Sequence, residues 1–117
     1  MTEALSMAGM AEIPITIVLA QRSGPSTGTP TYTAQSDLHF AIHAGHGEFP
    51  RFVVAPGDAQ QAVEWAGHAL SLSWQFQVPS ILMTDKTLSE GYTRSPPRSC
   101  SRHTRRCLCP PEKVMHT

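Results

Sequence analysis

The sequence lacks a long hydrophobic run, and no apolar stretch approaches the roughly 20 residues that a membrane span needs. It also lacks a basic segment at its start, which a secretory signal peptide would carry. With neither feature present, we expect no membrane partner and a cytoplasmic location. The 117 residues give room for one modest domain.

Cysteine is absent from residues 1–93, and basic residues are scarce there. This part holds three basic and eight acidic residues, whereas residues 94–117 hold six basic residues and one acidic residue. All three cysteines also lie in the second part. The zero net charge therefore hides two different kinds of sequence: a domain over residues 1–93 and a basic tail rich in Cys, Pro and Arg over residues 94–117.

Residues 95–106 contain no aliphatic side chain. Such a segment cannot bury enough area to offset the entropy lost on ordering, so we predict that residues 94–117 are disordered. The arginines of the tail suit nucleic-acid phosphates, but no aromatic residue follows Tyr92 to stack on bases. We expect any such binding to be weak, non-specific and lost with salt.

Two groups of residues resemble metal ligands. His39 and His43 would share a helix face, as zinc ligands do, but no nearby carboxylate or cysteine completes a site. In the tail, Cys100, Cys107 and Cys109 match none of the common zinc or iron–sulfur spacings. We therefore expect no metal site, and we interpret the three cysteines as free thiols.

Helical and strand patterns alternate along the domain. The patterns predict helices at residues 2–11, from Ser36-Asp37 to Gly45, and 59–76, and strands at residues 13–20, 51–55 and 80–84. Asp58 is a natural N-cap for the third helix. Its buried stripe would contain Val63, Ala66, Leu70 and Ser73, widened by Ala62, Ala69 and Trp74. Residues 46–48 belong either to a subunit contact or to a solvated turn.

Strands that are apolar on both faces and separated by helices predict an α/β fold, in which a parallel sheet has helices on both faces. Three strands are few for such a sheet. We therefore expect a partial sheet that belongs to a larger domain or is completed by a partner.

The strand at residues 13–20 runs into a polar loop that contains Gly24, Pro25, Ser26, Thr27 and Gly28. Ligands of open α/β sheets bind beyond the carboxyl ends of the strands, so this loop is a candidate binding site. Arg22 follows the strand directly, and we expect the sheet to aim it into the crevice, where its planar fork suits a carboxylate or a phosphate. Ser26, Thr27 and Gly28 offer hydroxyl and N–H groups to an anion. The alternative is a solvated loop whose glycines and prolines only make turns.

A set of segments in chain order carries a family resemblance: residues 1–5, 9–14, 21–22, 24–28, 30–31, 35–38, 46–51, 55–56 and 78–79, with Asp85. In these segments the chain resembles the alpha subunit of the 2-oxoacid:ferredoxin (flavodoxin) oxidoreductases, which act on 2-oxoglutarate or pyruvate. The match favours the 2-oxoglutarate type. The resemblance implies that residues 1–93 are part of the domain that faces the pyrimidine ring of thiamine diphosphate, a fragment of a thiamine-diphosphate-binding fold.

The resemblance also implies roles for residues. Arg22 would bind the substrate carboxylate, and Thr31 would line the substrate pocket, although Thr31 also suits the cap of a turn. Residues 24–28 would form a loop beside the substrate and the cofactor. The whole enzyme would decarboxylate a 2-oxoacid oxidatively to its acyl-CoA, and the cofactor would supply the carbanion chemistry.

Partners and cofactors follow from the same resemblance. Thiamine diphosphate with Mg²⁺ would be shared with a beta subunit. Iron–sulfur clusters and coenzyme A would belong to the holoenzyme and would not bind this chain, and ferredoxin or flavodoxin would take electrons from the holoenzyme. The family's alpha chain carries, upstream of the segments matched here, the carboxylate that activates the aminopyrimidine. We therefore expect no catalytic residue in this chain and no activity from the chain alone. The alternative is a non-enzymatic α/β module whose basic tail binds nucleic acid.

Overall fold

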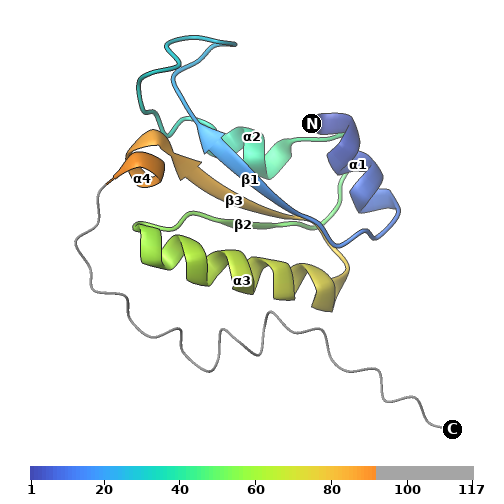
Figure 1. The fold of residues 1–117 in the computed structure, drawn as a ribbon. Helices are drawn as coiled ribbons and strands as arrows, with labels where there is room; N and C mark the ends of the chain where they lie inside the picture. Colours follow the sequence, from blue (N-terminus) through green and yellow to red (C-terminus); the bar gives the residue numbers. More distant parts are fainter. Residues whose placement is uncertain (92–117) are drawn as a thin grey trace, which may run out of the picture.

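A computed structural model describes residues 1–91 of the chain (Figure 1). Its elements are α1 Thr2–Met10, β1 Thr16–Gln21, α2 Leu38–His43, β2 Phe52–Val54, α3 Ala59–Phe76, β3 Ser80–Asp85 and α4 Lys86–Glu90. The predicted disordered tail at residues 94–117 and its three cysteines lie outside the described residues. Among the helices of residues 1–91, none is long and apolar enough to cross a membrane.

The three strands form one parallel sheet in the order β1-β3-β2. The last strand in sequence is therefore the central one. Helix α3 lies on one face of the sheet, and α1 and α2 lie on the other (Figure 1). The predicted α/β fold, with a parallel sheet and helices on both faces, is confirmed.

The core lies between the sheet and the layer of α1 and α2. Leu5 of α1 and Ala41 of α2 pack against Ile81 and Met83 of the central strand, and Ile17 of β1 joins this cluster. These strand residues have odd numbers because alternate side chains of a strand point to the same face. This cluster is the part of the core that lies on the α1 and α2 side of the sheet.

The first strand begins three residues later than the prediction. Glu12 has a φ of 53°, and the Ile13 N–H donates to the Ala8 carbonyl at 2.9 Å. This bond from the third residue after α1 back into its last turn is the bond of a Schellman motif, which satisfies a helix carbonyl that would otherwise be unpaired. The Ile13 N–H therefore bonds back to α1, and β1 begins only at Thr16.

Helix α3 has the predicted bounds, and its predicted cap is confirmed: the Asp58 side chain accepts a hydrogen bond from the Gln61 N–H at 2.7 Å. The predicted buried stripe is wrong at Val63, one of its four main residues, and at Trp74 on its edge. Ala69 and Ser73 are buried, but Val63 is 69% exposed and Trp74 is 63% exposed. Helix α3 packs mainly on the central strand β3, and it contacts β2 and β1 about equally.

Helix α4 is absent from the sequence prediction, which ends the third strand without a following helix. Asp85, the last residue of β3, caps this short helix by accepting a hydrogen bond from the Leu88 N–H at 2.7 Å. Five residues give too short an apolar pattern to be distinguished from a turn.

Candidate functional site

A cleft of about 550 Å³ opens at the carboxyl ends of the strands. Its lining comes from the ends of β1 and β3, the loop after β2, the first residue of α3, and parts of α2 and α4: Gln21, Gln35, Leu38, Ala55, Pro56, Gly57, Asp58, Ala59, Met83, Thr84, Asp85, Thr87, Leu88 and Gly91. This edge is where open α/β sheets bind ligands. The cleft and the loop beside it are therefore the candidate site.

Asp85 lies at the carboxyl end of the central strand and is only 8% exposed. Its Oδ2 accepts a hydrogen bond from Gln35 Nε2 at 2.9 Å, and its Oδ1 accepts the α4 cap bond from Leu88. These hydrogen bonds, first that from Gln35 and then that from Leu88, lower the pKa of Asp85 below its usual value. The carboxylate is thus ionised at neutral pH and held from two sides.

Gln21 is the last residue of β1 and is also 8% exposed. In the sheet it lies beside Asp85, its register partner. Its side-chain Oε1 accepts a hydrogen bond from the Asp37 N–H at 3.1 Å, just before α2 begins. The ends of β1 and β3 therefore each bind one residue of the segment that leads into α2. Gln21 accepts a hydrogen bond from Asp37, and Asp85 accepts one from Gln35.

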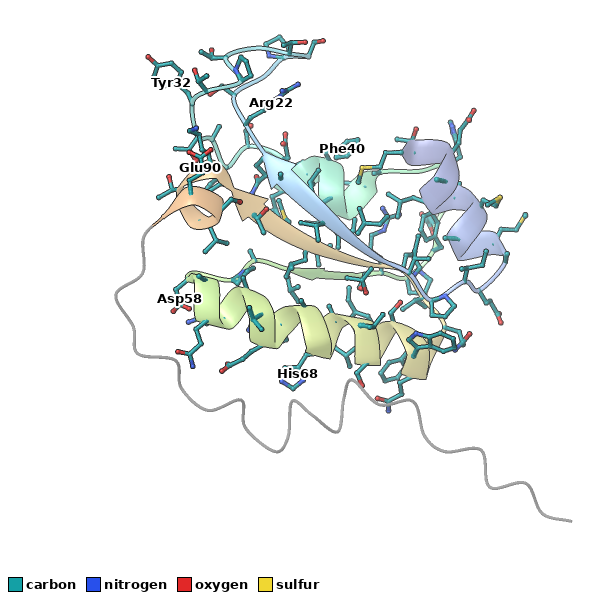
Figure 2. The ribbon with its side chains drawn as sticks, viewed as in Figure 1. Arg22, Tyr32, Phe40, Asp58, His68 and Glu90 are labelled. Atoms are coloured by element: carbon teal, nitrogen blue, oxygen red, sulfur yellow. The ribbon has the colours of Figure 1, made fainter. Side chains whose placement is uncertain are left out.

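The polar loop at residues 22–34 projects beyond the end of β1 (Figure 2). An isolated antiparallel bridge joins Ser23 to Thr29, with the Thr29 N–H donating to the Ser23 carbonyl at 3.3 Å. Gly28 is required at the turn: its φ is +47°, and a Cβ there would lie 2.0 Å from the Ser23 carbonyl oxygen. The loop is therefore a closed turn with a defined backbone.

The turn has two limbs: one leaves β1, and the other returns toward α2. Arg22 directly precedes the Ser23–Thr29 bridge on the first limb, and Thr31 follows the bridge on the returning limb. Both side chains are exposed, and neither is among the residues that line the cleft. Figure 2 shows Arg22 on the limb that leaves β1 and Tyr32 on the returning limb. The expectation that the sheet aims Arg22 into the crevice does not match this conformation, because the turn carries Arg22 past the strand end and outside the cleft.

The two carboxylates of the cleft already accept hydrogen bonds from within the chain. Asp85 is held by Gln35 and Leu88, and Asp58 caps α3 through Gln61. Within residues 1–91, both acidic residues of the cleft are thus engaged at helix ends.

The histidines of α2 are placed as the sequence predicts, on one helix face. The rings of His39 and His43 stack with their centroids 6.1 Å apart. Among residues 1–91, no three His, Cys, Asp or Glu side chains are grouped as a metal ion would require. The backbone N–H of His46 donates to Ser6 Oγ at 2.7 Å, which ties the segment after α2 to α1.

Comparison with known proteins identifies the family. The model of the family described as "pyruvate flavodoxin/ferredoxin oxidoreductase, thiamine diphosphate-binding" matches residues 1–110. The chain belongs to this family.

Within this family, the chain is 51% identical over 96 residues to the alpha subunit of 2-oxoacid:ferredoxin oxidoreductase 1 of Sulfurisphaera tokodaii. That match covers 82% of this chain and 15% of the relative. It is 33% identical to the 2-oxoglutarate synthase subunit KorA of Methanothermobacter thermautotrophicus, covering 98% of this chain and 31% of the relative. The chain therefore spans a minor part of the length of these relatives.

A solved structure in the same family supports the fold. The 2-oxoglutarate:ferredoxin oxidoreductase from Magnetococcus marinus, solved with 2-oxoglutarate, coenzyme A and succinyl-CoA bound, superposes with a TM-score of 0.72 at 44% identity. The superposition covers 75% of this chain and 15% of that chain. The partial parallel sheet is therefore a fragment of that family's domain.

Sequence reasoning missed Gln21 and Gln35 as part of the site. Gln21 falls at the end of a strand, and a polar residue at that position is a signal that it faces the carboxyl edge. Gln35 lies in a polar segment, and its partner Asp85 is 50 residues away in sequence. No local pattern connects the two.

Proposed function

We propose that this chain forms part of the alpha subunit of a 2-oxoacid:ferredoxin oxidoreductase and supplies the loop that binds the substrate carboxylate. The observation that carries the proposal is the polar turn with its exposed arginine at the carboxyl edge of a sheet that belongs to this family. The names of the relatives support a 2-oxoacid as the substrate class, and the Magnetococcus marinus structure favours 2-oxoglutarate.

In this proposal Arg22 pairs with the substrate carboxylate. Its planar guanidinium can form two parallel, charge-assisted hydrogen bonds with a carboxylate. Thr31, on the facing limb of the turn, lines the substrate pocket. Gly24, Pro25, Ser26, Thr27 and Gly28 form the tip of the turn and present hydroxyl and backbone N–H groups toward the substrate and the cofactor.

The remaining parts of the reaction come from outside this chain. Thiamine diphosphate with Mg²⁺ is shared with a beta subunit, and iron–sulfur clusters and coenzyme A bind elsewhere in the holoenzyme. Ferredoxin or flavodoxin accepts the electrons, in the cytoplasm. In this proposal both cleft carboxylates serve as helix caps, the cofactor-activating carboxylate comes from another segment, and the chain is inactive alone.

The test replaces Arg22 with alanine in the assembled enzyme that carries this segment. Loss of a bidentate charge pair costs about a hundredfold in kcat/KM for the 2-oxoacid, since hydrogen bonds to charged groups contribute about 1.5–3 kcal/mol. The matched control is Lys86→Ala, which also removes one positive charge but breaks only an exposed ion pair with Glu90. Subunit assembly, measured by size-exclusion chromatography, should not change in either variant.

An unchanged kcat/KM in Arg22→Ala, or an equal loss in Lys86→Ala, would remove Arg22 from the substrate site. The alternative, a non-enzymatic module whose tail binds nucleic acid, has no support from the family match or from the relatives named above.

A further inference from the structure

The turn at residues 22–34 is attached to the domain mainly by hydrogen bonds, because it has little burial to hold it. All its residues are exposed except Ser23 and Ala34, which are half-buried. Its internal backbone bonds, such as Tyr32 N–H to the Thr29 carbonyl at 3.1 Å, shape the turn but do not fix it to the sheet. The limb that carries Arg22 continues directly from β1. The returning limb needs a separate attachment.

Gln35 provides that attachment. Its Nε2 donates to Asp85 Oδ2 at 2.9 Å, and the acceptor is ionised, which makes the bond stronger than one between neutral groups. Asp85 is itself immobilised, since it is nearly buried at the end of the central strand and its other oxygen caps α4. The exposed returning limb is thus tied to a nearly buried residue at the end of the central strand.

A second bond lies two residues further along the chain. The Asp37 N–H donates to Gln21 Oε1 on β1, the strand beside β3. Residues 35 and 37 are therefore bound by the ends of two neighbouring strands, just before α2 begins. The Thr33 side chain, on the same limb, also donates to the Asp85 carboxylate and helps to lower its pKa. Loss of the Gln35 bond would therefore loosen the returning limb back to the Ser23–Thr29 bridge without releasing it fully.

We propose that Gln35 is a positioning residue of the substrate site: its bond to Asp85 fixes the returning limb, so that Thr31 keeps a constant place relative to Arg22. This inference rests on the proposed function of the Arg22 turn. It adds a residue that acts through the loop and not by contact with the substrate.

The first test measures amide hydrogen exchange of residues 22–34 in the full 117-residue chain. Gln35→Leu removes the amide that binds Asp85. The matched control is Gln60→Leu, which also removes an amide-to-carboxylate bond, from Gln60 to Glu64 on the exposed face of α3. Exchange of the Thr29 and Tyr32 N–H groups, which are hydrogen-bonded within the turn, should be about tenfold faster in Gln35→Leu, since a charge-assisted bond is lost, and unchanged in the control. Exchange in β3 should stay the same in both.

The second test measures steady-state kinetics with 2-oxoglutarate in the assembled enzyme. Gln35→Leu should raise KM about tenfold and change kcat less than about twofold, because a loosened limb weakens the placement of the substrate. A role in folding alone would lower the amount of active enzyme and leave KM unchanged. Gln35→Glu keeps the length of the side chain but places a carboxylate against Asp85, so it should also raise KM about tenfold at pH 7. This variant replaces Gln35→Leu in the test if Gln35→Leu does not fold.

Unchanged exchange in the turn would overturn the attachment by Gln35. Faster exchange with an unchanged KM would overturn the positioning role. Failure of the proposed function is distinguishable, because it would appear as an unchanged kcat/KM in Arg22→Ala, whatever the exchange of the Gln35 variants.

Discussion

Replacement of Ile81 by alanine should be the most informative single test of the fold. Ile81 is fully buried in the central strand, and in the sheet it lies between Ile17 of β1 and Val53 of β2. On the α1 and α2 side it belongs to the same cluster as Leu5. This row of side chains crosses the whole sheet, so no neighbouring loop can move in to fill a cavity at its centre.

The magnitude follows from the carbons removed. Ile81→Ala deletes three buried carbons, which are worth about 2.4 kcal/mol at about 0.8 kcal/mol for each CH₂. The cavity left behind raises the total to about 3–4 kcal/mol. Ile81→Val, which deletes one carbon, should cost about 1 kcal/mol.

Urea unfolding of the 117-residue chain, followed by far-ultraviolet circular dichroism, measures these values. At a denaturant slope of about 2 kcal/mol/M, Ile81→Ala should lower the midpoint by about 1.5–2 M and leave the slope unchanged. Val63→Ala is the control, because Val63 is 69% exposed and its loss should change the free energy of unfolding by less than about 0.5 kcal/mol. A cost below about 1 kcal/mol for Ile81→Ala, or one equal to that of Val63→Ala, would refute the packing of this row.

Two further results are expected. A Cβ at Gly9 would lie 2.5 Å from Phe49 Cδ2. Gly9→Ala should therefore lower the free energy of unfolding by about 1–3 kcal/mol in thermal or urea unfolding, although alanine is the better helix former. An increase in stability would contradict this contact. The hydrogen bonds from Gln35 and Leu88 lower the pKa of Asp85, so the stabilisation that they give is complete above about pH 4, the usual value for Asp, and is lost as the pH falls through the lowered folded-state pKa. Asp85→Asn should remove this part of the pH dependence, and parallel stability curves for the two proteins between about pH 2.5 and pH 7 would argue against it.

Much of the fold could be read from local signals. The bounds of α3 follow from the Asp58 cap and the helical spacing of its apolar residues, and the parallel sheet follows from apolar strands that alternate with helices. The start of β1 and the existence of α4 could not be read in this way. The first depends on a left-handed residue, Glu12, that is not a glycine, and the second on one aspartate that ends a strand and caps a helix.

The sequence by itself determined the family, the α/β class, and the polar turn after β1 that carries Arg22, because each of these depends on residues that are near one another in the chain. Only the tertiary structure decided the strand order β1-β3-β2, which brings the last strand to the centre, and the exposure of Val63 and Trp74 on α3. It also decided that Gln35 binds Asp85. Side-chain hydrogen bonds between residues 50 positions apart depend on where the strands end in space, and that is set by packing of the whole sheet and not by any local pattern.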